Sequence, residues 1–258
     1  MTLHPGVRHA ARAAALVVLA AFAGAARSQA DDTSPLPPFS RAVPGGAFPA
    51  AWIPLTFPHL HRHTTYALVR DADDGVVVRA EADASASGLV VRLDHDAGDW
   101  SRLAWRWKVD RPIVRSDVTR RGGDDYPVRL YVAFKHVPER VSLFERARYA
   151  LITLLYGEAP PHAALNYIWD ARSPVGTVAP NPYTSRVRMI VVESGTARLG
   201  RWLGYERDVL ADYRAAFGEE PPPISGVGIM SDADDTGESA LAWYGDVTLR
   251  RRADPSGR

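Results

Sequence analysis

The sequence predicts a mainly β fold, an antiparallel β-sandwich with one or two helical insertions. Short apolar runs of strand length follow one another from residue 39 to residue 249, separated by glycine, proline and aspartate. Two of these runs alternate apolar and polar residues, as half-buried strands do. Strands and helices do not alternate regularly along the chain, which argues against a parallel doubly wound sheet.

Residues 1–30 have the features of a secretory signal peptide. Arg8 and Arg12 precede an apolar run over residues 13–26, and small residues at Ser28 and Ala30 predict cleavage after Ala30. The run is shorter than the roughly 20 residues that a membrane span needs. We therefore expect a periplasmic or secreted protein. Residues 31–38 are then a disordered lead, 39–250 a single sandwich domain and 251–258 a tail.

Charge and cysteine usage narrow the classes of partner. Removal of residues 1–30 takes away three arginines and no acid, so the formal net charge falls from +1 to −2. A nucleic-acid-binding protein needs a concentrated basic footprint, which this balance does not provide. No later stretch is apolar enough to span a membrane, and with no cysteine in the chain there is no disulfide.

The first expected strands cover residues 66–69, 76–81 and 88–93, and a turn over residues 71–75 joins the first two. This pattern is typical of an antiparallel meander. The runs over residues 103–109 and 129–134 alternate most clearly, and each directs every second residue to the core. The expected core residues of these two strands are Leu103, Trp105, Trp107, Val109, Leu130, Val132 and Phe134.

Two segments change to helical periodicity. Residues 138–157 carry an apolar stripe from Val141 to Leu155, with Pro138 near the start and Gly157 after the end. Residues 206–217 carry a second stripe, and Gly218 is placed to end that helix in a left-handed conformation. The remaining strands are expected over residues 165–170, 186–193, 226–231 and 241–249, with Val247 and Leu249 in the core.

Five blocks of sequence, in this order, resemble the bacterial family known as domain of unknown function 3047. They are GDDYPVRLYVAF from Gly123, ALNYIWD from Ala164, NPYTSRVRMIVVESG from Asn181, ERDVLADYRAAFG from Glu206 and DADDTGESALAWYGDVTL from Asp232. The resemblance covers residues 39–250. It implies a secreted or periplasmic protein without an established activity, so it supplies no catalytic residues.

The closing motif WYGDV, residues 243–247, is similar to the last strand of galactose-binding-like jelly rolls and carbohydrate-binding modules. This second resemblance implies a jelly-roll sandwich, but a fold does not by itself assign a function.

Polar residues in the opposite phase to the core predict a binding face. Arg106, Lys108, Arg129 and Tyr131 fall in this phase, and Asp170 joins them if the strands align. Arginine offers a bidentate fork to anionic groups, and aromatic rings stack on sugar faces. The hypothesis is a site for a glycan or another small polar ligand, including a carboxylated or phosphorylated sugar. The alternatives are an ordinary solvated sheet face and a face covered by the helix at 141–155.

Two clusters have metal-ligand character. Asp232, Asp234, Asp235 and Glu238 offer the oxygen ligands that Ca²⁺ prefers, although the twelfth position from Asp232 is Trp243 rather than the glutamate of an EF-hand. An unoccupied turn, in which aspartates bond their own backbone, explains these residues as well. On a strand, His59, His61 and His63 would face one side and suit Zn²⁺ or Cu²⁺, but a solvated edge explains them better.

The catalytic alternative is a glycan-active hydrolase or lyase. Glycoside hydrolysis commonly uses two carboxyl groups, and Glu193 is paired in this hypothesis with Asp124, Asp125, Asp170 or Glu206. No serine-hydrolase elbow, phosphate loop or dinucleotide fingerprint is present, so the sequence favours a binding protein over an enzyme. A third hypothesis is an envelope assembly factor that uses the exposed face of the helix at 141–155.

Overall fold

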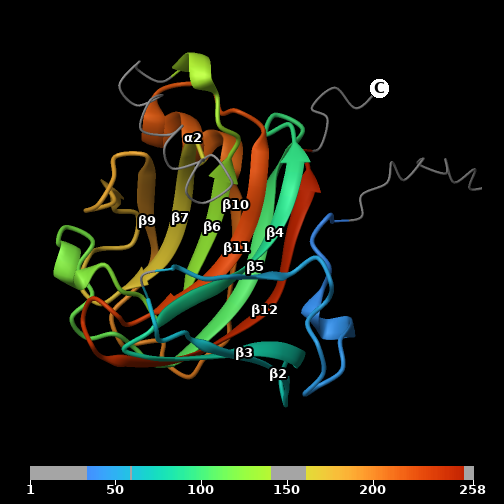
Figure 1. The fold of residues 1–258 in the computed structure, drawn as a ribbon, viewed down its shortest axis with the longest axis vertical. Helices are drawn as coiled ribbons and strands as arrows, with labels where there is room; N and C mark the ends of the chain where they lie inside the picture. Colours follow the sequence, from blue (N-terminus) through green and yellow to red (C-terminus); the bar gives the residue numbers. More distant parts are fainter. Residues whose placement is uncertain (1–33, 59, 141–160, 253–258) are drawn as a thin grey trace, which may run out of the picture. The chain divides into compact units, whose positions relative to one another are not determined.

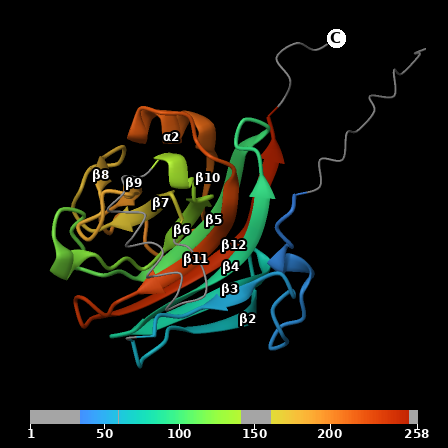
Figure 2. The same cartoon turned by 45° about the horizontal axis from the view of Figure 1, so that its top comes forward.

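Two β-sheets pack face to face in the computed structural model, which describes residues 34–58, 60–140 and 161–252 (Figures 1 and 2). Among these residues, sheet A has seven strands in the order β1 (Ile53–Leu55), β4 (Ala86–His95), β11 (Ile224–Asp232), β6 (Arg129–Phe134), β7 (Ala163–Asp170), β9 (Val187–Ser194) and β8 (Val178–Pro180). Sheet B has five, in the order β10 (Leu203–Asp208), β5 (Trp100–Arg111), β12 (Ser239–Arg251), β3 (Gly75–Asp83) and β2 (Thr65–Asp71).

Neighbouring strands are antiparallel except for the pair β7 and β9, which is parallel. The predicted fold class, an antiparallel jelly-roll sandwich with helical additions, is confirmed.

The core between the sheets follows the predicted alternation. Leu103, Trp107 and Val109 on β5 are fully buried, as are Leu130, Val132 and Phe134 on β6. The closing strand β12 adds Val247 and Leu249, as expected. Burying one such side chain stabilises the fold by roughly 1.5–3 kcal/mol. The buried residues of β5 and β6 therefore determine which face of each sheet is turned toward the core.

The predicted meander ends after two strands. β2 and β3 form an antiparallel hairpin, with Gly75 at φ +75° in their turn. The next strand, β4, instead pairs with β1 and β11 in sheet A. Ala84 lies between β3 and β4 with φ +43°, a left-handed conformation that turns the chain sharply there. The chain thus changes sheet at a corner that periodicity alone does not reveal.

The helix predicted at 206–217 is α2 (Val209–Phe217), which begins three residues later because Leu203–Asp208 forms strand β10. The Asp208 side chain accepts a hydrogen bond from the Ala211 N–H and caps the helix start, and Gly218 ends the helix at φ +72°. Val209 and Tyr213 bury the inner side of α2 against the end of the core. The 3₁₀ helices of the described residues are η1 (Phe39–Arg41), η2 (Arg121–Gly123) and η3 (Pro138–Arg140).

The folded domain begins before residue 39, where the sequence predicted its start. Leu36 is 1% exposed and packs in the core together with Phe39 of η1. Ser40 donates to both carboxylate oxygens of Asp246, at 2.9 Å from its N–H and 2.6 Å from its Oγ. Trp52 Nε1 also donates to the Pro37 carbonyl at 2.9 Å. The residues from 34 to 38 are therefore part of the sandwich rather than a disordered lead, because the apolar Leu36 fills a core position.

Two predictions fall outside the described residues: the signal segment at 1–30 and the helix at 141–155. In the part of the chain that is described, no helix has the length and apolar character needed to cross a bilayer.

Candidate functional site

The predicted binding face divides between the two sheets. Arg106 and Lys108 lie on the outer face of sheet B, whereas Arg129 and Tyr131 lie on the outer face of sheet A. The prediction of a single patch is therefore wrong. Alternation correctly directed all four side chains away from the core, but strands β5 and β6 belong to opposite layers.

Lys108 forms a closed cluster on sheet B. Its Nζ donates to Asp71 Oδ2 at 2.5 Å and lies 5.0 Å from the ring centroid of Trp202 and 4.8 Å from that of Trp243. Trp202 Nε1 donates to the other Asp71 oxygen at 3.0 Å. Burial alone would raise the pKa of Asp71, but the hydrogen bonds from Lys108 and Trp202 lower it below its usual value. This cluster stabilises the fold and leaves Lys108 little capacity for a ligand.

Arg106 is also paired, since its guanidinium contacts Asp74, a carboxylate from the β2–β3 turn.

Arg129 is the centre of a buried polar network on sheet A, and its side chain is 2% exposed. Its Nε donates to Asp232 Oδ1 at 2.7 Å, and its Nη2 donates to Asp232 Oδ2 and to the Asp124 carbonyl. Its Nη1 donates to Asp124 Oδ1 at 3.2 Å and to Tyr131 Oη at 3.3 Å. The Tyr126 ring covers the guanidinium at 4.4 Å. These protein groups occupy the donors of Arg129, so it is not a free anion receptor.

Burial and charge shift the pKa values of this network. Burial raises the pKa of Asp232 to about 8, while Arg129 acts in the opposite direction. Burial also raises the pKa of Tyr131 to about 12. For Arg129 burial works against the charged form, but Asp232, Tyr131 and Asp124 together raise its pKa above the usual value. Arg129 therefore stays cationic and acts as the counter-ion of the buried acids.

Carboxylate oxygens of Asp125, Asp232 and Asp234 lie within 4.8 Å of one another. This cluster includes two of the four predicted Ca²⁺ ligands. Glu238 turns away, because its carboxylate accepts from Arg115 Nε at 2.6 Å and from the Val114 N–H at 2.7 Å. Sequence reasoning assigned Asp125 to catalysis, although its place is in this acidic cluster.

Donors already occupy much of the cluster. Both oxygens of Asp125 accept backbone N–H groups, from Asp235 at 3.3 Å and from Thr236 at 2.5 Å. Both oxygens of Asp232 accept from Arg129, and Oδ1 also accepts from the Tyr126 N–H. The residues are of the right type for Ca²⁺, but Arg129 and the backbone already supply positive partners to two of the three carboxylates.

Beside this cluster, three loops meet in an exposed surface that we call the ledge, defined by Arg121, Tyr183, Asp234 and Asp235. Tyr183 is 52% exposed, and its hydroxyl donates to Asp235 Oδ1 at 2.7 Å. The Arg121 guanidinium lies 5.3 Å from the Tyr183 ring centroid, and its Nε donates to the Pro182 carbonyl at 3.1 Å. The ledge joins the η2 loop, the β8–β9 loop and the β11–β12 loop.

The ledge is linked to the buried network by Asn181, whose Nδ2 donates to Asp124 Oδ2 at 2.7 Å. Burial and the nearby acids raise the pKa values of Asp234 and Asp235 above their usual range. Burial and the hydrogen bond to Asp235 raise the pKa of Tyr183 to about 12. The ledge therefore combines an exposed aromatic ring with carboxylates that lack full charge compensation.

Sequence reasoning missed Arg121, Asn181 and Tyr183. The one available signal was the turn NPYTS, residues 181–185, in which a tyrosine follows a turn-forming Asn-Pro pair.

Asp170 shares the outer side of sheet A with Arg129 but does not pair with it. Its Oδ1 accepts the N–H groups of Arg172 at 2.7 Å and Ser173 at 2.6 Å, so it closes the turn after β7. Its Oδ2 is buried without a hydrogen-bond partner among the described residues.

The proposed catalytic pairs with Glu193 do not share a cleft. Glu193 lies on the inner side of sheet A, where its carboxylate accepts from the Tyr205 hydroxyl at 3.0 Å. Asp124, Asp125 and Asp170 belong to the outer side of that sheet, and Glu206 lies on the outer face of sheet B, paired with Arg102. The hydrolase hypothesis therefore loses its carboxylate pair, because β9 directs Glu193 into the sandwich.

The histidine hypothesis finds no geometric support in the part of the chain described. His61 and His63 are exposed, and His59 lies outside the described residues. Among those residues, the acidic trio of Asp125, Asp232 and Asp234 is the group found with metal-ligand spacing, and it contains no histidine.

The fold and the site together define a jelly-roll sandwich with a polar site built on the outer face of one sheet. The chain belongs to the family described as Protein of unknown function (DUF3047), whose model matches residues 50–248. No curated protein matches the sequence significantly. The ordered segment at 34–49 thus lies before the family match, although Leu36 and Phe39 pack in the same core.

Several solved structures are similar to this chain at low sequence identity. One is the family 11 carbohydrate-binding module of the cellulosomal cellulase Lic26A-Cel5E of Clostridium thermocellum, with 10% identity, a TM-score of 0.42, and coverage of 87% of this chain and 98% of that one. A second is the cellulose-induced protein Cip1, with 11% identity, a TM-score of 0.39, and coverage of 79% and 93%. The enzymatically active domain of tailspike protein 4 of bacteriophage CBA120 has 8% identity, a TM-score of 0.36, and coverage of 79% and 20%.

Proposed function

We propose that the protein is an extracytoplasmic binding protein whose ledge binds a neutral, hydroxyl-rich ligand of the glycan class. The observation that carries the proposal is the exposed Tyr183, held by its hydroxyl to Asp235 on a surface that three separate loops build. The extracytoplasmic location rests on the signal features of residues 1–30.

The chemistry of the ledge suits hydroxyl donors. Asp234 is half-buried and Asp235 is exposed, and carboxylates are strong acceptors for hydroxyl groups. A tyrosine ring offers a flat apolar face for the C–H groups of a sugar and a polar tip for its hydroxyls. Arg121, beside the ring, adds hydrogen-bond donors at the rim.

Charge argues for a neutral ligand. Five aspartates gather in and beneath the ledge, Asp124, Asp125, Asp232, Asp234 and Asp235, whereas Arg129 is consumed within the buried network. The raised pKa values of Asp234 and Asp235 reflect this excess of negative charge. An anionic sugar would be repelled here, so the earlier hypothesis of a carboxylated or phosphorylated sugar does not apply to the ledge.

The ledge is preorganised by the network beneath it. Arg129 fixes Asp232 at the end of β11, and Asn181 ties the Tyr183 loop to Asp124. A surface held in its binding conformation loses less conformational entropy on association, so a small area can bind usefully.

The test is a calorimetric titration of the purified protein with neutral glucan, xylan and galactan oligosaccharides. For a ligand that binds, Tyr183→Ala and Asp235→Asn are each expected to weaken affinity at least tenfold, equivalent to about 1.4 kcal/mol. Glu206→Gln is the matched control, because it removes an exposed, ion-paired carboxylate on the opposite sheet. Absence of binding to every neutral oligosaccharide, or binding that both ledge variants retain, would contradict the proposal.

The location has its own test. Mass spectrometry of the exported protein is expected to give an N-terminus at Asp31, whereas an intact N-terminal segment would contradict cleavage after Ala30.

The two alternative functions are a glycan-active hydrolase and an envelope assembly factor. None of the four carboxylates predicted to pair with Glu193 lies on its side of the sheet, so the hydrolase hypothesis has lost its support. The assembly-factor hypothesis depends on residues 141–155, outside the described chain, and remains a prediction tested by co-purification with envelope proteins.

A further inference from the structure

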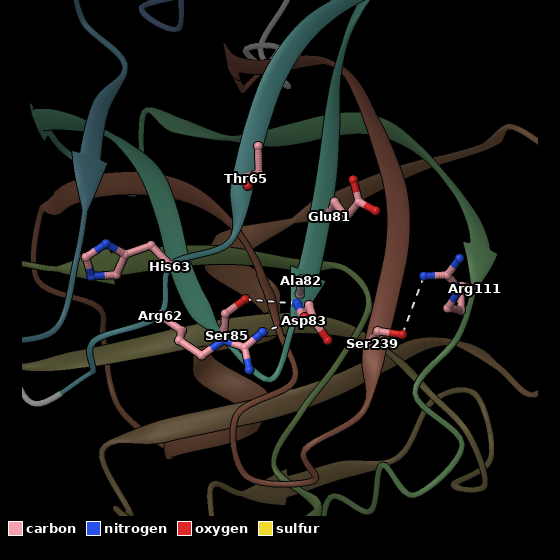
Figure 3. Close-up of a pocket in the computed structure, with 9 residues that line it drawn as sticks. All are labelled: Arg62, His63, Thr65, Glu81, Ala82, Asp83, Ser85, Arg111 and Ser239. Atoms are coloured by element: carbon pink, nitrogen blue, oxygen red, sulfur yellow. Dashed lines mark hydrogen bonds and ion pairs between the residues drawn. The ribbon is translucent and has the colours of Figure 1, made fainter.

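A second polar pocket lies at one end of sheet B and shares no lining residue with the ledge. We call it the end pocket, and Figure 3 shows the side chains that line it. Its volume is about 490 Å³, within the range of roughly 300–1,000 Å³ that is common for small-molecule sites. The residues that matter for the argument are Arg62, Thr65, Glu81, Asp83, Arg111 and Ser239.

A β-bulge brings Arg111 into this pocket. β12 pairs Ala242 with Val109 but Leu241 with Arg111, so Asp110 is an extra residue on β5. Strict alternation would have placed Arg111 in the same phase as the buried Val109. The bulge moves it to the outer face beside Leu241, and bulges commonly re-aim a side chain near a functional site.

Arg111 is weakly engaged by the protein. Its Nη1 donates to Ser239 Oγ at 3.4 Å, which is long for a hydrogen bond, and no carboxylate pairs with it within the described ranges (Figure 3). A guanidinium has five N–H donors, so most of those of Arg111 are available to a ligand. This differs from Arg129, which the buried network saturates.

Arg62 is the second available cation. It pairs with Asp83, but both side chains are more than half exposed, at 60% and 71%. Exposed pairs of this kind contribute roughly 0–1 kcal/mol, so a ligand anion can compete with Asp83 for Arg62. Glu81 is held by Arg79 at 2.9 Å and can accept hydroxyl groups, as can the side chains of Thr65 and Ser239.

We propose that the end pocket binds a small hydroxylated carboxylate, such as a uronic acid or a hydroxy acid. The ligand carboxylate takes the N–H fork of Arg111, assisted by Arg62, and its hydroxyls contact Ser239, Thr65 and Glu81. Guanidinium and carboxylate match in geometry, and such bidentate pairs are among the stronger hydrogen bonds. With Arg79, which holds Glu81, three arginines face two acids around the pocket, and this surplus of one positive charge favours a singly charged carboxylate over a doubly charged phosphate.

The test is a titration of the full protein with glucuronate and with glucose, monitored by NMR chemical shifts. The two sugars differ at C6, where glucuronate carries a carboxylate. Glucuronate is expected to bind at least tenfold more tightly than glucose, and Arg111→Gln to remove that preference. Arg111→Lys keeps the positive charge but lacks the paired N–H donors of the guanidinium, so it should lose part of the preference for glucuronate. Arg102→Gln is the matched control, because Arg102 is an exposed arginine on the same strand, paired with Glu206 outside the pocket.

Thermal melting of each variant shows whether it is folded. Equal affinities for the two sugars would overturn the proposal, as would a preference that Arg111→Gln retains while folded. Loss of glucuronate binding in Tyr183→Ala but not in Arg111→Gln would place the ligand on the ledge, which refutes the end pocket and leaves the proposed function intact. Retention of the preference in Tyr183→Ala is the expected result.

Discussion

Replacement of Arg129 by methionine is expected to be among the most damaging single changes in the sandwich. Methionine keeps much of the volume but removes every donor that Arg129 directs to Asp232, Asp124 and Tyr131. The carboxylate of Asp232, 3% exposed, is then left in the interior without its counter-ion.

The magnitude follows from the burial of this pair. Removing one partner of a buried ion pair typically costs about 3–5 kcal/mol, because the remaining charge stays desolvated. For domains of 150–250 residues, 1 kcal/mol shifts the melting temperature by roughly 2–4 °C. We therefore expect Arg129→Met to lower the melting temperature by about 6–20 °C at pH 9, where Asp232 is ionised, measured by tryptophan fluorescence.

Two further measurements separate a charge effect from a simple loss of packing. The double variant Arg129→Met, Asp232→Leu removes both charges and is expected to regain at least half of the lost stability. The surface control Arg102→Met breaks an exposed pair with Glu206 and should cost less than about 1 kcal/mol.

The effect also depends on pH. The pKa of Asp232 is raised to about 8, so above that pH the parent protein holds an ionised Asp232 against Arg129. The variant must there keep Asp232 protonated or bury it uncompensated, so its deficit relative to the parent should be larger at pH 9 than at pH 6. A cost below about 1 kcal/mol, equal at both pH values, would refute the view that Arg129 is the counter-ion of the network.

Three other predictions concern different parts of the molecule. Asp71→Asn should be less stable than the parent protein at pH 7, and the difference should shrink as the pH falls. Because the pKa of Asp71 is lowered in the folded protein, its ionised form contributes stability at pH values above the ordinary pKa of aspartate, and this contribution is lost on protonation. A difference in melting temperature that stays constant from pH 7 to pH 3 would contradict this. Ca²⁺ should change the melting temperature by less than about 1 °C relative to chelator, because Arg129 already supplies a positive charge to the acidic cluster. A larger rise in melting temperature that Asp234→Asn abolishes would restore the calcium hypothesis. Leu36→Ala should lower the free energy of unfolding by about 2–5 kcal/mol, measured by chemical denaturation. The control Val43→Ala, at a 72% exposed site, should change it by less than about 0.5 kcal/mol. Equal effects of the two changes would show that the segment before residue 39 is not part of the core.

The strands with strong alternation could be predicted from sequence because burial leaves a period of two in the residues. Trp105, Trp107 and Val132 are buried as that period requires. The three-residue strands β1 and β8 were missed because three residues contain only a single repeat of the alternation. Strand β10 was partly read as helix, since the stripe of α2 was extended back to Glu206.

The site was only partly predictable for a different reason. Alternation tells whether a side chain faces the core or solvent, but not which sheet the strand joins, so Lys108 and Tyr131 were grouped although they lie on opposite layers. The contact of Arg129 with Asp232 spans 103 residues of sequence, and nothing local to either residue indicates the other. The usable local signals were the acidic composition of the loop over residues 232–238 and the NPYTS turn at residues 181–185.

The positions of the arginines explain why the protein presents two surfaces of different character. Arg129, once buried, neutralises acids within the fold, and the loops above it are left with Asp234 and Asp235 in excess. Arg111, moved outward by one extra residue in β5, keeps its donors for solvent or a ligand. One guanidinium therefore sets the architecture of the ledge from below, and the other defines what the end pocket can bind. The same residue type has opposite roles because burial and strand register, rather than composition, decide which donors remain free.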